Sequence, residues 1–216
     1  MNENYTSLRD VMQHAQSFGT SIKDIRNIPT DTLIRLLVYG KIFAYEETIR
    51  IAKTYFQNEI DSDDIAVSMV CFYRKKPLAK VVLRTFYIRF GFHMLFQCDY
   101  TAFIGAIIHE LCHLVLPKCG HNKEFYLLVE KKLLEAKIID NEYNGWVKDH
   151  YPFRRMYYEP GECNLCDEAS IDTLRNRLFG EACSGERCLR KEYERMYYEE
   201  FDRAAIMHNI TTKNVF

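Results

Sequence analysis

The chain has 216 residues and a formal net charge of −1. Its hydrophobic content of 48% and aromatic content of 14% exclude an intrinsically disordered protein, because such proteins lack the apolar residues needed for a core. The near-neutral charge excludes a general attraction to nucleic acid or membranes, so any basic surface must be local. The length allows one good core and a small accessory module.

The N-terminal sequence contains no basic stretch followed by an apolar one, so we expect no secretory signal. The longest apolar run is interrupted by His109 and Glu110, which argues against a membrane-spanning helix. We therefore expect an intracellular protein, cytoplasmic or nuclear, without membrane association. In that compartment its eight cysteines are expected to be thiols or metal ligands rather than a disulfide framework.

Residues 1–42 are predicted to form a helical N-terminal extension. Apolar residues recur at helical spacing from Leu8 to Phe18, and a second helix is expected from Asp31 to Tyr39, closed by Gly40. We expect this extension to pack on the rest of the protein, with a partner-binding cap as the alternative.

The next segments predict a helix, then strands, then a second helix. A helix is expected from Tyr45 to Phe56, a strand from Ile65 to Tyr73, and one or two further strands from Ala79 to Phe90. This order predicts an α+β fold with a small, mostly antiparallel sheet beneath the helix that follows.

The strand region is basic because it contains Lys75, Lys76, Lys80, Arg84 and Arg89. These residues would form either a groove for a phosphate backbone or a solvated strand face whose charges protect an edge. Acidic residues shortly before the first strand favour the solvated face.

The motif that specifies a reaction lies in the following helix. His109 and His113 stand four residues apart in an apolar run with helical periodicity, so both imidazoles project from one face. Glu110 occupies the position at which the HExxH pattern places a carboxylate beside the water that a metal activates. A proline and a glycine end the helix, and His121 can fold back as a third ligand. Three protein ligands leave one tetrahedral position open, which is typical of catalytic zinc.

The alternative is that these are buried or surface histidines with ordinary partners. With 7 His and 18 Glu in this chain, H-E-x-x-H arises by chance in roughly 2 such chains per hundred. The apolar residues before His109 place the motif on a core helix, which favours the metal site.

After the motif, a helix from Phe125 to Leu134 is expected to support His121, with Lys131 and Lys132 on its exposed side. Cys112 and Cys119 are expected to be a buried apolar residue and a loop thiol, respectively, with metal binding or oxidation as the alternative.

The segments GAIIHELCH and GHNKEF, with His121 in the third-ligand position and Phe125 four residues later, resemble the SprT-like zinc metalloproteases, which include the Spartan type. Tyr87 to Phe90 is similar to the strand that precedes their active-site helix. The resemblance covers about residues 43–135.

This resemblance implies a SprT-like metalloprotease domain at residues 43–145. Its catalytic Zn²⁺ would be held by His109, His113 and His121, with Glu110 as the catalytic base. A protein substrate is implied, with DNA-associated or DNA-crosslinked proteins as candidates and DNA as a candidate partner.

Residues 146–216 are predicted to form a C-terminal module. The C-x2-C-x16-C-x4-C spacing is close to that of a structural zinc site with four thiolates: Cys163, Cys166, Cys183 and Cys188. Reduced thiols and disulfides are the alternatives, and His150 or His208 could replace one cysteine. The segment from Leu189 to Met207 is expected to be an amphipathic helix that packs back on the body.

The sequence therefore predicts a zinc-dependent peptidase with one catalytic and one structural zinc. The alternative is a non-enzymatic zinc-scaffolded module that binds DNA or protein, and a zinc hydrolase acting on a non-peptide substrate is a third reading.

Overall fold

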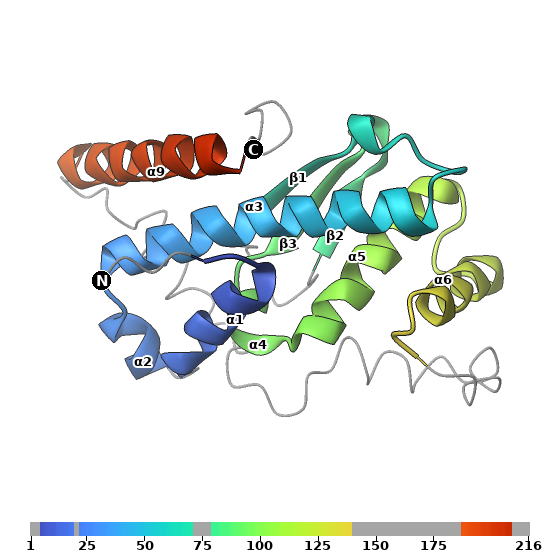
Figure 1. Ribbon diagram of the computed structural model, residues 1–216, viewed down its shortest axis with the longest axis horizontal. Coiled ribbons are helices and arrows are strands. Elements are labelled where there is room, and N and C mark those ends of the chain that lie inside the picture. Colours follow the sequence, from blue (N-terminus) through green and yellow to red (C-terminus); the bar gives the residue numbers. More distant parts are fainter. Residues whose placement is uncertain (1–4, 20–21, 71–78, 140–186, 209–216) are drawn as a thin grey trace.

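The computed structural model describes residues 5–19, 22–70, 79–139 and 187–208. They form an α+β fold in which a small sheet is packed among helices (Figure 1). The described helices are α1 (Leu8–Ser17), α2 (Ile22–Asn27), α3 (Thr30–Tyr55), α4 (Met94–Gln97), α5 (Tyr100–Val115), α6 (Lys123–Glu135) and α9 (Arg187–Met207). The strands are β1 (Ala66–Val70), β2 (Ala79–Val82) and β3 (Tyr87–Gly91), and short 3-10 turns cover Ser62–Asp64 and Leu83–Thr85.

The three described strands lie in the order β1–β3–β2. β2 and β3 pair antiparallel, whereas β1 and β3 pair parallel. The sheet is therefore mixed rather than mostly antiparallel as expected. Side-chain alternation predicts which residues share a face, but it does not specify the direction in which a strand enters the sheet.

One face of the sheet packs against helices. Two rows of apolar side chains cross the strands: Val67, Ile88 and Val81, and Met69, Phe90 and Ala79. α3 and α5 lie on the same side of the sheet, in front of the strands in Figure 1. The ring of Phe90 contacts that of Phe103 in α5, with a centroid distance of 5.2 Å. This apolar face therefore sets the position of α5.

α3 is one helix of 26 residues where the sequence predicted two. Gly40 was expected to end the first helix, but it lies buried within α3. A Cβ atom at this position would come within 2.6 Å of Leu95 Cδ1 and 3.1 Å of Met69 Sδ. Glycine thus allows close packing, at a helix-propensity cost of about 1 kcal/mol. The helix continues without a break across residues 42 and 43, where the boundary between the extension and the next domain was expected.

The N-terminal extension packs on the body, as expected. Leu8, Val11, Met12 and Ala15 are buried on the inner side of α1. Gln16 Nε2 also donates hydrogen bonds to the carbonyl oxygens of Leu95 and Cys98, at 3.3 and 2.8 Å. Since these carbonyls belong to the segment that leads into α5, α1 helps to fix the start of that helix.

The terminal helix predicted from the apolar stripe is α9, which lies alongside α3 (Figure 1). Phe201 is buried, and Lys41 Nζ donates a hydrogen bond to Tyr197 Oη at 3.1 Å. His208 Nδ1 lies 3.1 Å from Glu46 Oε1. Burial lowers the pKa of Lys41 to about 8, so this interface includes an amine that is costly to keep charged. Among the described residues, no helix combines the length and apolar character needed to cross a membrane.

Candidate metal centre

α5 carries His109, Glu110 and His113. Asp99 is its N-cap, and the Asp99 carboxylate accepts a hydrogen bond from the Ala102 N–H at 2.7 Å. This cap fixes the residue at which the helix that carries the motif begins.

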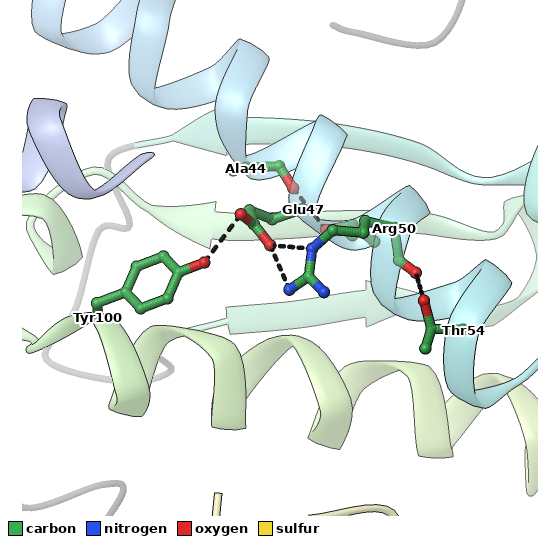
Figure 2. Close-up of polar contacts among 6 residues, drawn as sticks. Ala44, Glu47, Arg50, Thr54 and Tyr100 are labelled. Atoms are coloured by element: carbon green, nitrogen blue, oxygen red, sulfur yellow. Dashed lines mark hydrogen bonds and ion pairs between the residues drawn. The ribbon is translucent and has the colours of Figure 1, made fainter. Parts of the chain in front are cut away.

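A polar contact fixes the first turn of α5 to α3. Figure 2 shows Tyr100 and Arg50 on either side of Glu47. Tyr100 Oη donates a hydrogen bond to Glu47 Oε1 at 2.9 Å, and Arg50 Nη2 lies 2.7 Å from Glu47 Oε2. Together with the Phe90–Phe103 contact, this pairing holds the first turn of the motif helix against α3 and the sheet.

The segment between α5 and α6 brings His121 back to α5. Asn122 donates its N–H to the Gly120 carbonyl at 2.7 Å, and its side-chain oxygen accepts a hydrogen bond from the Phe125 N–H at 3.0 Å. Asn122 is therefore the N-cap of α6. The cap fixes His121 directly in front of the helix.

The imidazoles of His109, His113 and His121 converge. His121 Nε2 lies 3.0 Å from His109 Nε2 and 3.2 Å from His113 Nε2. Around a tetrahedral ion with metal–nitrogen distances of about 2.0–2.1 Å, ligand nitrogens stand about 3.3–3.4 Å apart, close to these values. His109 is buried, His113 half-buried and His121 exposed, so the cluster opens to solvent beside His121. The three residues could hold a metal ion.

The protonation of the three rings suits a metal. Burial, reinforced by the two neighbouring imidazoles, lowers the pKa of His109 well below its usual value. Burial and the adjacent His121 lower the pKa of His113 to about 4, and burial also lowers the pKa of His121. Neutral imidazole is the form that binds a metal. The three neutral imidazoles are therefore a set of donors suited to the Zn²⁺ ion that the sequence predicts.

Glu110 follows His109 in α5 but does not belong to the cluster of ligand atoms. Its side chain is buried, and burial raises the pKa of the carboxyl group to about 8. The backbone N–H of Val81 in β2 donates a hydrogen bond to this carboxyl group and opposes the shift. Glu110 thus lies between the motif helix and an edge strand, in a setting that suits proton exchange near neutral pH.

Sequence reasoning missed the central role of Phe125 in this cluster. It was predicted as part of the apolar side of α6, and it is fully buried there. Its ring also contacts the rings of His109, His113 and His121. The spacing of four residues from His121 to Phe125 was the available signal, although it gives no indication of contacts with α5.

Lys132 was expected on the outside of α6, but its side chain is buried. Its amine donates hydrogen bonds to the backbone carbonyl of Tyr55 and to Glu59, the latter at 2.9 Å. Tyr55 is the last residue of α3, where free carbonyls attract a positive charge. This contact explains why a lysine is buried, and it anchors α6 to the end of α3. Lys131 is exposed, as predicted.

The described cysteines near the motif behave as expected. Cys112 is buried and free, and burial raises the pKa of its thiol. Cys119 is half-buried and free, with its thiol 3.4 Å from Glu124 Oε2. Of the predicted zinc-binding cysteines, Cys188 lies in the first turn of α9, and Cys163, Cys166 and Cys183 lie outside the described residues.

Comparisons with protein-family models, with curated proteins and with solved structures gave no match. The function must therefore be inferred from the three-histidine cluster and its surroundings.

Proposed function

We propose that the protein is a zinc-dependent metallopeptidase of the SprT-like type that hydrolyses protein substrates. The observation that carries this proposal is the convergence of His109, His113 and His121, with nitrogens 3.0 and 3.2 Å apart. Three neutral nitrogen ligands with one side open to solvent suit zinc in a catalytic site.

Zinc at this position would polarise the scissile carbonyl and lower the pKa of a water molecule in the open position. Glu110 would serve as the base that takes a proton from the attacking water and as the acid that gives it to the leaving amine. Burial raises the pKa of this carboxyl group to about 8, which makes its carboxylate a stronger proton acceptor than that of an exposed glutamate. Val81 holds this carboxyl group through its backbone N–H, so β2 helps to orient the base.

An experiment that removes the base but keeps the ligands separates an enzyme from a scaffold. We expect Glu110→Gln to bind as much zinc as the wild type, measured by elemental analysis. Its cleavage of casein should fall about 100-fold or more, since general acid–base catalysis contributes about 10²–10⁴-fold. His113→Ala removes a ligand and should lower the zinc content by one ion per chain.

Equal cleavage by the wild type and Glu110→Gln would contradict the proposal, and so would a zinc content that His113→Ala leaves unchanged. A protein that binds zinc at the cluster but cleaves no protein would match the alternative, a non-enzymatic module scaffolded by zinc.

We propose a second, structural zinc at Cys163, Cys166, Cys183 and Cys188, on the strength of their spacing. Four thiolates would leave no open position for chemistry, so this ion would stabilise the C-terminal module.

DNA-associated proteins are the substrate class that the SprT-like resemblance suggests. Lys80 in β2 stands directly opposite Arg89 in β3, and both side chains are exposed. Like charges in this arrangement destabilise a sheet, so their presence supports a role in binding an anion. The Arg89 guanidinium also lies over the ring of Tyr87, 4.9 Å from its centroid. This pairing of basic and aromatic groups is of the kind used to bind single-stranded DNA.

A further inference from the structure

The ring of Phe125 contacts all three imidazoles of the cluster. It stacks on His113 with a centroid distance of 4.2 Å and an interplanar angle of 22°. It meets His109 and His121 edge-on, with centroid distances of 4.9 and 5.2 Å. Phe125 therefore forms an apolar wall common to two ligands from α5 and one from the loop before α6.

The position of this ring is itself tightly determined. The backbone N–H of Phe125 is held by the side chain of Asn122 at 3.0 Å. The side chain is fully buried, and Val129 and Leu133, which follow on the same side of α6, are fully buried as well. At the far end of α6, Lys132 binds the end of α3. A displacement of the ring would disturb the packing of α6. The ring therefore provides a fixed surface against which the three imidazoles pack.

We propose that Phe125 is a positioning residue that holds the three imidazoles in the geometry that a metal ion requires. The inference rests on the metal site of the proposed function. Phe125 has no donor atom, so it acts only through the rings that it touches. An imidazole that is free to rotate must lose that freedom when it binds a metal, which weakens binding. A ring packed against each imidazole restricts the rotation beforehand, as outer-shell hydrogen bonds do in other metal sites.

The test compares two buried positions on α6. Phe125→Leu keeps an apolar side chain of moderate size but removes the aromatic faces and edges. Val129→Ala removes buried methyl groups one turn further along the helix and serves as the control for lost packing. Zn²⁺ affinity is measured by competition with a chromophoric chelator, and ligand geometry by the visible absorption bands of the Co²⁺-substituted protein. In both measurements, the signal that His113→Ala retains is subtracted as that of the proposed cysteine site. Thermal unfolding of the metal-free proteins reports the structural cost of each change.

We expect Phe125→Leu to weaken Zn²⁺ binding about 10–100-fold, the range typical of outer-shell partners of metal ligands. Its Co²⁺ bands should shift or broaden because the nitrogen positions are less well defined. Val129→Ala should lower the thermal stability of the metal-free protein but leave Zn²⁺ affinity and the Co²⁺ bands unchanged.

Wild-type affinity and bands in Phe125→Leu would overturn the inference while leaving the metal site intact. Equal loss of affinity in Val129→Ala would also overturn it, because the effect would then follow from general destabilisation. If the wild type bound neither Zn²⁺ nor Co²⁺ at the histidines, the proposed function would fail and this inference with it.

Discussion

His93 illustrates how burial acts on a histidine outside the cluster. It stands at the N-cap of α4, two residues after the end of β3. Its ring occupies the space that a Cβ atom of Gly91 would need, and its side chain is buried. Within the described part of the chain, Nδ1 has no hydrogen-bond partner. Burial lowers the pKa of the ring to about 4, so protonating His93 opposes folding.

We expect His93 to make the protein sensitive to acid. As the pH falls from 6.5 to about 4, the unfolded chain gains a proton at this residue that the folded chain does not bind. The free energy of unfolding therefore decreases with falling pH. The full difference between 6.5 and about 4 corresponds to about 3 kcal/mol. Urea unfolding at several pH values should show a flatter dependence for His93→Leu than for the wild type.

All other histidines are common to the two proteins, so the difference between the curves isolates His93. A loss of stability in His93→Leu that is the same at every pH would indicate only lost packing. Parallel curves would thus contradict the assigned role of this buried ring.

At the level of single residues, the sequence predicted the groups that converge but not the groups that hold them. His109, His113 and His121 could be identified because the spacing in a helix and a following turn limits where they lie. The contacts of Phe125 and the burial of Lys132 depend on how α6 packs against α5 and α3. That packing joins residues far apart in sequence and leaves no local pattern.

Among the secondary-structure elements, β2 combines two roles. It is an edge strand of the described sheet, and its residue Val81 pairs opposite Ile88 of β3. Because an N–H directed to Glu110 points away from β3, we expect Val81 and Ile88 to form a pair without ladder hydrogen bonds. The outer edge of the sheet therefore supplies a donor to the proposed catalytic base.

Val81→Pro would remove this donor without removing a ladder hydrogen bond, since proline is tolerated where an edge N–H points away from the sheet. The Val81 hydrogen bond lowers the pKa of Glu110, so its loss should raise that pKa further. We expect a pH profile of peptide cleavage that is displaced toward alkaline pH, with unchanged zinc content. The measurement is the rate of cleavage as a function of pH.

Val82→Pro provides the matched control. By alternation, the Val82 N–H faces β3, so proline there should lower the melting temperature more than Val81→Pro does. An unshifted pH profile in a well-folded Val81→Pro protein would show that β2 does not influence the base.

Element types were predictable because apolar periodicity differs between helices and strands. The continuity of α3 was not, because Gly40 reads locally as a helix end. The contacts of this glycine with Leu95 and Met69 become evident only after the chain has folded. The parallel direction of β1 relative to β3 could not be predicted from local sequence patterns either, since it depends on the path of the chain between the strands.

Across the whole molecule, charge is balanced, with a net value of −1, so any attraction to DNA must come from a local surface. The exposed pair Lys80 and Arg89 supplies such a surface on β2 and β3, and Arg84 lies exposed in the turn between these strands. The same strand, β2, contacts Glu110 through Val81. By alternation, Lys80 and Arg89 face away from α5, so a DNA strand bound to them would lie on the opposite face of the sheet from the motif helix.

We expect the double variant Lys80→Glu/Arg89→Glu to bind single-stranded DNA about tenfold or more weakly than the wild type, because it replaces two attractive charges with repulsive ones. Wild-type affinity should also fall as salt increases, with a shallower dependence in the variant. Fluorescence anisotropy with a labelled oligonucleotide measures both. Affinity that neither salt nor the substitutions change would indicate that these residues form only a solvated strand face.

The overall order of helix, strands, motif helix and supporting helix followed from the sequence, and so did the packing of α1 and α9 on the body. The residues of α3 that contact the C-terminal helix could not be predicted. Lys41 contacts Tyr197 in α9, and Glu46 contacts His208 just after it. Nothing in the sequence distinguishes these two residues from charged residues on the surface.

The uninterrupted α3 has a practical consequence for trimming the protein. At 1.5 Å per residue, a helix of 26 residues is a rod about 39 Å long. Lys41 in this helix donates a hydrogen bond to Tyr197 of α9, and the carbonyl group of Tyr55, its last residue, accepts one from Lys132. A fragment that started at residue 43 would cut this helix halfway along. The smallest autonomous piece of this chain should instead start upstream of Thr30 and retain the C-terminal helix.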